Sequence, residues 1–315
     1  MKISILDKIA MGEDTPFDPL YSFGEVVFYE TTSPEEVLSH VADSDVIILN
    51  KVRITAETIK HAPSLKLICV FATGYDNVDL KAAREKGVAV CNVPGYSTES
   101  VVLFTVATAL SLIAHLNEYN EYVRSGAYSR SSSANRITPV VHEISGKTWG
   151  IVGGGNIGRA VARVAEALGA RVIVNKRTPS ADLECVSIEE LCRESDIISL
   201  HCPLNDGTRE LINKDRIALM KPSVVLVNEA RGAVVSEADV AEAILSGKIS
   251  AYGCDVYSIE PFREDHPYNK IKDKSNVILT PHSAWGAYEA RERCVNIIAQ
   301  NIAAFINGER NNRVD

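Results

Sequence analysis

The sequence predicts an α/β protein with two domains, each built on a parallel sheet. Three observations support this fold class. The chain has 315 residues, which is enough for two domains of ordinary size. Short apolar runs with the length of strands alternate with helical patterns along most of it. A glycine-rich turn between a strand and a helix occurs only in the second part, so the two parts have different tasks.

The first part of the chain alternates buried strands with short helices and carries no glycine fingerprint. Its apolar runs are rich in β-branched residues, which favours strands buried on both faces of a parallel sheet. We expect a smaller domain here. The predicted strands are 3–6, 46–49, 67–71 and 88–91, and the predicted helices are 34–41, 56–61 and 80–86.

Residues 92–97 (N-V-P-G-Y-S) form a break rich in turn formers, and residues 98–124 follow as one long, largely apolar helix. A helix that is apolar over so many turns needs burial on more than one side. A homodimer interface is the simplest explanation, and a fully intramolecular core is the alternative. The polar stretch 125–138 is expected to be a loop.

The second part is organised around residues 149–158, W-G-I-V-G-G-G-N-I-G. Gly153 permits a tight turn, Gly155 allows the backbone to approach a pyrophosphate, and Gly158 lets the following helix pack close to the strand. Free N–H groups at the helix start would face the phosphates. A dinucleotide site is therefore predicted, with an empty α/β turn as the alternative.

The end of the next strand, residues 171–175, indicates which dinucleotide binds. Enzymes that prefer NAD usually place an acidic residue there to hold the ribose 2′-hydroxyl. This chain instead has Lys176 and Arg177 there, and the first carboxylate after the strand is Asp182. Two cations suit a 2′-phosphate. We therefore favour NADP(H), and keep NAD(H), with the basic pair merely solvated, as the alternative.

The same alternation continues to the end of the chain. A final amphipathic helix at 287–307 is expected to return to the first domain, which makes that domain discontinuous. We therefore assign 1–98 and 284–315 to a substrate-binding domain and 99–283 to a dinucleotide-binding domain. The remaining predicted strands are 197–200, 224–228, 251–256 and 277–280, and the helices are 188–194, 214–219 and 237–246.

Net charge, apolar runs and cysteine spacing indicate which classes of partner to exclude and which compartment to expect. The net charge of −8 disfavours nucleic acid and anionic membranes as partners. No apolar run is long enough to span a membrane, and the N-terminal residues do not resemble a signal peptide. The seven cysteines are scattered without a C-x-x-C pair, which is typical of free thiols in a reducing compartment. We expect a cytoplasmic protein.

Three side chains that follow predicted strands could perform chemistry together. Arg231, Glu260 and His282 each follow a strand, and ligands of a parallel sheet bind outside the carboxyl ends of its strands. A guanidinium could hold a 2-keto acid, an imidazolium could protonate its carbonyl, and a carboxylate behind the imidazole would favour its charged form. The alternative is a structural histidine and a surface arginine. His201 is a weaker candidate, and no metal-ligand spacing occurs.

The chain resembles the D-isomer-specific 2-hydroxyacid dehydrogenase family over nearly its whole length, and most closely its glycerate dehydrogenase or hydroxypyruvate (glyoxylate) reductase subgroup. Several motifs in the family's order carry the resemblance. They are A-T-G-Y-D-N-V-D-L (72–80), N-V-P-G-Y-S-T-E-S-V (92–101), G-K-T-W-G-I-V-G-G-G-N-I-G-R-A-V-A (146–162), H-C-P-L-N-D-G-T-R-E-L-I-N (201–213), M-K-P-S-V-V-L-V-N-E-A-R-G-A-V-V (220–235), G-C-D-V-Y-S-I-E-P (253–261) and T-P-H (280–282).

The resemblance implies a Rossmann-type cofactor domain inserted into a flavodoxin-like substrate domain, hydride transfer between NAD(P)H and a small 2-keto acid, and a homodimer. Asn175 to Arg177 resemble a run found in members that prefer NADPH. Arg231 would bind the substrate, with Glu260 behind His282 as acid and base. Backbone N–H groups at Thr73 and Gly74 would hold the substrate carboxylate. The implied cofactor contacts are Asn156, Ile157, Cys202, Pro203, Thr208, Ala230, Arg231 and Asp255.

Two rival functions stay open at this stage. One is an NAD-dependent dehydrogenase for another D-2-hydroxy acid, such as lactate or phosphoglycerate; the extra phosphate would need cations, for which Lys51 and Arg53 are the early candidates. The other is a non-catalytic protein that binds NAD(H) as a sensor. The chain has no long tail and no basic surface run beyond the catalytic core, which favours an enzyme.

Overall fold

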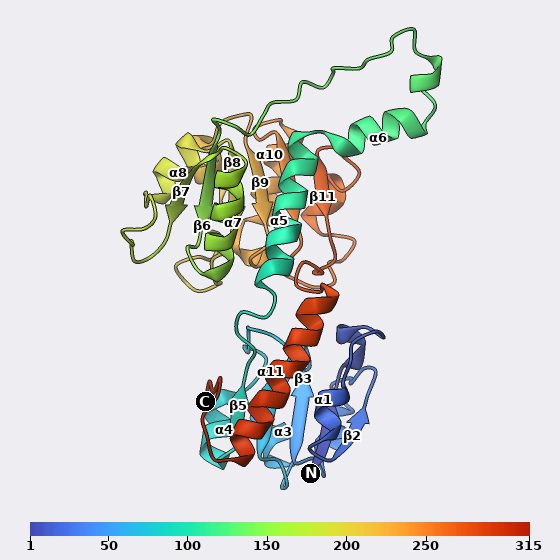
Figure 1. Cartoon of the computed structure of the whole chain (residues 1–315), viewed down its shortest axis with the longest axis vertical. Coiled ribbons are helices and arrows are strands. Elements are labelled where there is room, and N and C mark those ends of the chain that lie inside the picture. Colours follow the sequence, from blue (N-terminus) through green and yellow to red (C-terminus); the bar gives the residue numbers. More distant parts are fainter. The chain divides into compact units, whose positions relative to one another are not determined.

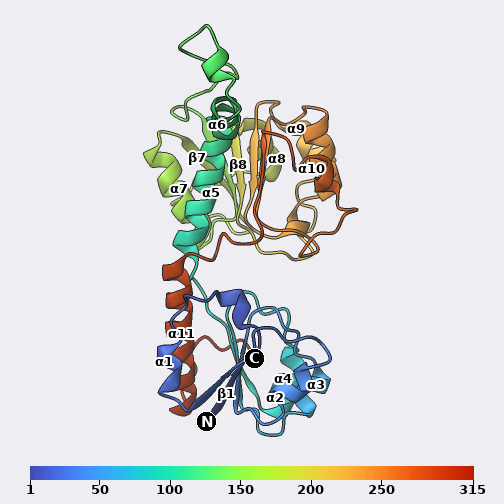
Figure 2. The ribbon, with the colours of Figure 1, turned by 90° about the vertical axis from the view of Figure 1, so that its right-hand side faces the viewer.

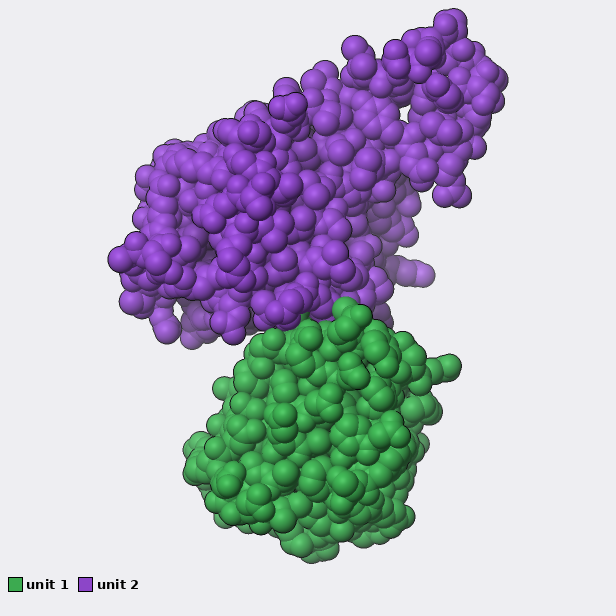
Figure 3. Space-filling model, in the orientation of Figure 1, with its two compact units in different colours: residues 1–97, 286–315 green, residues 98–285 purple.

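In the computed structural model, which describes residues 1–315, the chain divides into two units (Figure 3). Unit 1 comprises residues 1–97 and 286–315, and unit 2 comprises residues 98–285. Each unit is built on its own parallel sheet with helices on both faces. The predicted α/β fold class, with two parallel-sheet domains, is confirmed.

The sheet of unit 1 has the strand order β2–β1–β3–β4–β5, and all its pairings are parallel. This is the flavodoxin-like order. Helices α1 and α11 cover one face, and α2, α3 and α4 cover the other (Figure 2). The elements are β1 (Lys2–Ile5), α1 (Asp18–Tyr21), β2 (Glu25–Phe28), α2 (Val37–Val41), β3 (Val46–Leu49), α3 (Ala56–Lys60), β4 (Leu67–Val70), α4 (Leu80–Lys86), β5 (Ala89–Cys91) and α11 (Tyr288–Ile306).

The strand β2 is an element that the sequence analysis did not predict. It lies at the edge of the sheet and pairs only with β1. None of its four residues is fully buried, whereas all four residues of β3 are. Its short apolar run, Val26 to Phe28, was the signal in the sequence that could have identified this strand.

The sheet of unit 2 has the order β11–β10–β9–β8–β6–β7, again all parallel. An isolated bridge from Val174 to Cys185 adds the trace of a further strand beyond β7, which completes the Rossmann order. The elements are β6 (Thr148–Val152), α7 (Asn156–Ala167), β7 (Arg171–Asn175), α8 (Ile188–Glu194), β8 (Ile197–Leu200), α9 (Lys214–Leu219), β9 (Val225–Asn228), α10 (Glu237–Leu245), β10 (Ala251–Cys254) and β11 (Val277–Leu279).

The strand order of unit 2 reverses at β6, which lies between β7 and β8. Ligands of such sheets bind outside the carboxyl ends of the strands at this point. Two apolar clusters fix the sheet in place: one packs under α5 (Thr98–Ile113) and α7, and the other under α8, α9 and α10 (Figures 1 and 2). The loops at the carboxyl edge are therefore mounted on a rigid support.

The prediction of one helix over 98–124 is wrong. The structure has two helices, α5 and α6 (Leu116–Arg124), with a bend of 63° between them. His115 lies at the bend with a φ of 51°, in the left-handed region that ends a helix. The reason is burial: α5 packs Ala109 and Leu112 into the core of unit 2, whereas α6 buries no residue.

Beyond the bend, α6 and the chain up to residue 141 project away from the rest of unit 2 (Figure 1). We call residues 116–141 the arm. It includes a single 3-10 turn, Tyr128–Arg130, within the predicted loop. No single helix is long and apolar enough to cross a membrane; α5 and α6 pass that test only as a bent pair, by length and composition. Several apolar side chains of the arm are exposed: Leu116, Val123, Tyr128, Ile137, Val140 and Val141.

Candidate active site

The glycine turn after β6 makes close approaches that only glycine allows. Gly153 has a φ of 104° and its N–H donates to the carbonyl of Asn175 at 2.8 Å. A Cβ at Gly153 would lie 2.6 Å from the carbonyl oxygen of His201. A Cβ at Gly158 would collide with the carbonyl oxygen of Gly153. These contacts pack the turn tightly against the loop after β8 and the start of α7.

Gly155 differs from its two neighbours in the motif, because a Cβ there would meet no atom within 4 Å. Gly155 directly precedes Asn156 and Ile157, the first residues of α7. Open space therefore lies beside the N–H groups and the positive dipole end of a helix. Space and donors at this point fit a pyrophosphate, so the residues present suit a dinucleotide.

Two cations, Lys176 and Arg177, directly follow the end of β7. The Lys176 side chain passes over the turn, since its Cδ would lie 2.9 Å from a Cβ at Gly154, and its Nζ donates to the Ser180 hydroxyl at 3.2 Å. Arg177 is exposed. Asp182 is held in an ion pair by Arg159, which lowers the pKa of that carboxyl to about 2.

The loop after β8 contains the predicted cofactor contacts Cys202, Pro203 and Thr208. The Thr208 hydroxyl donates to the Pro203 carbonyl at 2.6 Å, and it accepts from the Asn205 N–H at 2.8 Å, which closes the loop. Burial raises the pKa of the Cys202 thiol to about 11, so this thiol stays neutral. Two hydrogen bonds therefore hold the shape of the loop next to the glycine turn, and its buried thiol carries no charge.

His201, the weaker histidine candidate, lies at the start of this loop. Both of its ring nitrogens are buried and have no hydrogen-bond partner. Burial alone lowers the pKa of His201 to about 3. Its imidazole is therefore neutral at physiological pH and cannot deliver a proton in that range.

The segment after β9 presents Arg231. The Asn228 side chain braces it, because its Oδ1 accepts from the Ala230 N–H and its Nδ2 donates to the Arg231 carbonyl, both at 3.1 Å. The Arg231 side chain is exposed, and its Nη1 donates to the Ala230 carbonyl at 2.8 Å. Gly232 follows and packs directly against the backbone of Tyr257, where no Cβ would fit. The guanidinium is therefore mounted next to the segment that carries Glu260.

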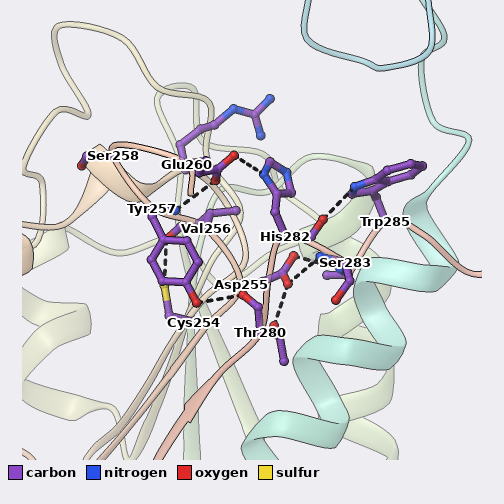
Figure 4. Close-up of polar contacts among 12 residues, drawn as sticks. Cys254, Asp255, Val256, Tyr257, Ser258, Glu260, Thr280, His282, Ser283 and Trp285 are labelled. Atoms are coloured by element: carbon purple, nitrogen blue, oxygen red, sulfur yellow. Dashed lines mark hydrogen bonds and ion pairs between the residues drawn. The ribbon is translucent and has the colours of Figure 1, made fainter. Parts of the chain in front are cut away.

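Glu260 and His282 meet as a carboxylate–imidazole pair (Figure 4). Nδ1 of His282 lies 2.6 Å from Oε2 of Glu260, and Oε1 of Glu260 accepts from the Tyr257 N–H at 3.1 Å. Because a carboxylate only accepts hydrogen bonds, Nδ1 carries the proton. Nε2, the outer nitrogen, has no partner. Such an arrangement can exchange a proton at Nε2 with a ligand.

The backbone of His282 is itself unusual. Its φ is 52°, in the left-handed region that β-carbon crowding disfavours, and such residues cluster at functional sites. Its N–H donates to the Thr280 carbonyl at 3.1 Å, and its carbonyl accepts from the Trp285 indole at 2.9 Å. This tight turn directs the imidazole toward Glu260 (Figure 4).

Asp255, predicted as a cofactor contact, holds the turn around His282 in place. Its carboxylate is 1% exposed and accepts from the Thr280 hydroxyl at 2.6 Å and from the N–H groups of Ser283 and Ala284 at 2.8 and 2.9 Å. Tyr257 adds a hydrogen bond from its hydroxyl to the Thr280 carbonyl at 2.8 Å. The proposed contact of Asp255 with the cofactor stays a prediction.

The structure also contains a buried carboxyl that sequence reasoning missed. Glu229, between Asn228 and Ala230, is 8% exposed, and its Oε2 has no hydrogen-bond partner. Burial, followed by the nearby charge of Asp255, raises the pKa of Glu229 to about 9. A charged residue directly after a buried strand was the signal that could have identified it.

Thr73 and Gly74 lie in unit 1, beyond the carboxyl end of β4. The Thr73 hydroxyl donates to the Val93 carbonyl at 3.0 Å, and the Thr73 carbonyl accepts from the Asn92 side chain at 2.7 Å. Their role in binding a carboxylate stays a prediction. No group of three or more His, Cys, Asp or Glu side chains is arranged to hold a metal ion.

Comparison with known proteins gives a consistent result. The profile of the family described as D-isomer specific 2-hydroxyacid dehydrogenase, NAD binding domain, matches residues 106–284. A relative from Blautia hydrogenotrophica named hydroxypyruvate reductase is 36% identical, and the alignment covers 100% of each chain.

Two solved structures extend the comparison to the fold. One is an acyclic imino acid reductase in complex with NADPH and D-Arg, with a TM-score of 0.88, 29% identity and coverage of 100% of each chain. The other is a D-lactate dehydrogenase from Aquifex aeolicus complexed with NAD and lactic acid, with a TM-score of 0.84 and 31% identity, covering 98% of this chain and 96% of that one.

Proposed function

Because the chain belongs to the D-isomer specific 2-hydroxyacid dehydrogenase family, whose members are NAD-dependent oxidoreductases, we propose that it reduces a small 2-keto acid to a D-2-hydroxy acid, with hydroxypyruvate or glyoxylate as its best substrates. The observation that carries the proposal is the 2.6 Å pair of Glu260 and His282, on the same sheet edge as Arg231. The name of the Blautia relative supports hydroxypyruvate.

The three side chains have complementary roles in this reaction. Arg231 holds the carboxylate and the keto oxygen of the substrate through its planar guanidinium. A bound nicotinamide cofactor supplies the hydride. His282 donates the proton on Nε2 to the keto oxygen, so that an alcohol forms, and Glu260 stabilises the imidazolium before this transfer. Oxidation of the hydroxy acid requires the same imidazole in its neutral form.

We further propose NADP(H) as the favoured cofactor, with NAD(H) as the alternative. Lys176 and Arg177 offer two positive charges where NAD-preferring enzymes have an acidic residue. Asp182 is engaged with Arg159 and does not supply that acid. Changing Lys176 to Asp and Arg177 to Ser should shift the ratio of kcat/KM for NADPH over NADH toward NADH. Arg163→Ser on α7 is the matched control, and an unchanged ratio in the double variant would contradict the proposal.

A second copy of this chain is the partner that we propose, as in a homodimer in the cytoplasm. The exposed apolar side chains of the arm support it, above all Ile137, which is 82% exposed. Seven free cysteines fit a reducing compartment. Light scattering should give a dimer for the wild type and a monomer for Ile137→Glu with Val140→Glu. Ile9→Glu, which lies outside the arm, should stay dimeric.

The deciding experiment is an initial-rate assay that follows the near-ultraviolet absorbance of the reduced nicotinamide. Hydroxypyruvate, glyoxylate and pyruvate are compared, each with NADPH and with NADH. Fast oxidation of NADPH with hydroxypyruvate is the expected result. Fast oxidation with NADH alone would retain the reaction and remove the 2′-phosphate argument. Absence of turnover with all three acids, with cofactor binding intact, would favour a sensor.

A further inference from the structure

A second carboxylate–imidazole pair lies close in sequence to the first but away from solvent. Nε2 of His266 lies 3.0 Å from Oε2 of Glu237, and their side chains are only 8% and 12% exposed. Glu237 is the first residue of α10, and His266 precedes the 3-10 turn η4 (Pro267–Lys270). The reaction proposed above uses neither residue.

Hydrogen bonding fixes the tautomer of His266. Its Nδ1 lies 3.2 Å from the N–H of Tyr268, and a backbone N–H can only donate, so Nδ1 accepts and carries no proton. Nε2 therefore carries the proton and donates it to Glu237. Packing fixes the ring as well: it stacks on Phe262 and meets Tyr257 and Tyr268 edge-on. The imidazole thus orients the Glu237 carboxylate and leaves no ring nitrogen for a ligand.

The other oxygen of Glu237 reaches the segment that carries Glu260. Oε1 of Glu237 accepts from the Ser258 N–H at 2.8 Å, and Oε1 of Glu260 accepts from the Tyr257 N–H at 3.1 Å. Two neighbouring amides are thus bound by two different carboxylates. Residues 258–261 are exposed and bury little of their own surface; Ile259 is 58% exposed. Hydrogen bonds, rather than packing, therefore set the path of the chain at Glu260.

We propose that Glu237 and His266 are positioning residues for the reaction, which hold the 257–260 segment so that Glu260 faces Nδ1 of His282. This inference rests on the proposed function. The titratable groups around the pair are Tyr257, Tyr268 and Cys254, and burial raises the pKa of each, so all three are uncharged at neutral pH. The geometry of the outer pair, Glu260 and His282, thus depends on the inner pair, Glu237 and His266, which the proposed reaction does not use.

Glu237→Gln tests the proposal because an amide cannot replace this carboxylate. Ser258 N–H and His266 Nε2–H both need an acceptor, and glutamine offers one oxygen and a competing NH₂ group. We expect kcat for reduction to fall about tenfold and the basic limb of its pH profile to move to lower pH. Asp239→Asn is the matched control: Asp239 also accepts a backbone N–H, from Lys214, in the same first turn of α10, but it has no link to Glu260.

The same substitution in a Glu260→Gln background separates positioning from general destabilisation. If Glu237 acts through Glu260, its replacement should change kcat by less than about twofold there, because the coupled partner is already lost. An equal loss in both backgrounds, or an unmoved pH limb in folded Glu237→Gln, would overturn the inference. If Glu237→Gln does not fold, the same cycle is run with Glu237→Asp, which keeps the charge but withdraws the carboxylate.

The two hypotheses fail in different ways. A wild-type protein without turnover, or a Glu260→Gln variant as active as the wild type, would contradict the proposed function. The other outcome is that the wild type and Glu260→Gln behave as expected but Glu237→Gln is as active as Asp239→Asn. That result would contradict only the role of Glu237 and His266.

Discussion

The pair Glu260–His282 and the pair Glu237–His266 have the same chemistry and similar separations, 2.6 and 3.0 Å, but different surroundings. The outer pair is 23% and 26% exposed, whereas the inner pair is nearly buried. His266 uses both ring nitrogens within the protein, while His282 keeps Nε2 without a partner and adopts a left-handed backbone. Both histidines have a carboxylate neighbour, so the difference between the two is the Nε2 of His282, which is left without a partner on a partly exposed ring and can exchange a proton with a ligand.

The largest effect should come from removing the spare nitrogen. His282→Ala should lower kcat for reduction by up to about 10⁴-fold, since general acid catalysis contributes on that order. Binding of NADPH, followed by its fluorescence, should be unchanged. Turnover within tenfold of the wild type would show that another group delivers the proton, and would contradict the role that distinguishes His282 from His266.

Loss of the outer carboxylate should rank second. Glu260→Gln should lower kcat by about 10³-fold, because the imidazolium loses its counter-charge and Nδ1 its acceptor. The charged imidazole is needed for reduction, so the basic limb of the pH–rate profile should move to lower pH. Glu264→Gln, an exposed neighbour, is the control and should leave the profile in place. An unshifted limb in Glu260→Gln would contradict the pairing.

Glu229 is a buried carboxyl without an imidazole partner, and it should lower the free energy of unfolding at neutral pH. Its pKa of about 9 exceeds the ordinary value of 4.5, so the folded state binds more protons between these values, and the free energy of unfolding falls as pH rises through them. Glu229→Gln should remove this slope and raise the free energy of unfolding by about 3 kcal/mol at pH 7. Urea titrations from pH 5 to 9 measure the free energy of unfolding. The same pH dependence in the variant and the wild type would contradict the burial of this carboxyl.

The smallest effect should come from one support of the His282 turn. Thr280→Val removes one of the three hydrogen bonds that Asp255 accepts, and should cost about 1 kcal/mol in the free energy of unfolding. Thr280→Ser keeps the hydroxyl and should behave as the wild type in the same thermal unfolding experiment. A valine variant as stable as the wild type would contradict the contribution of this hydrogen bond.

Much of this arrangement could be predicted from the chain. Parallel strands share one carboxyl edge, so the positions of Arg231 and His282 after strands were enough to expect them on one side of the sheet. The glycine spacing likewise indicated the turn at Gly153. Glu260 was paired with His282 because it too follows a strand and because an imidazolium is favoured by a carboxylate behind it; the order of the family motifs implied the same pair.

Other features depend on contacts between segments that are distant in sequence. The bend at His115 occurs where burial of α5 ends, which the apolar composition of the helix does not reveal. The tethering of Ser258 by Glu237 crosses from α10 to another loop. Glu229 could be seen as a charged residue beside a strand, but its burial next to Asp255 results from the pairing of β9 with β10.

The interruption of unit 1 by unit 2 has a consequence for synthesis on the ribosome. Unit 2 is one continuous stretch and can complete its sheet while the chain is still growing. Unit 1 cannot, because α11 covers one face of its sheet and the N–H of Val314 donates to the carbonyl of Val90 on the edge strand β5. Residues 1–97 therefore cannot complete unit 1 before residues 286–315 have been made, and until then the apolar face under α11 is uncovered.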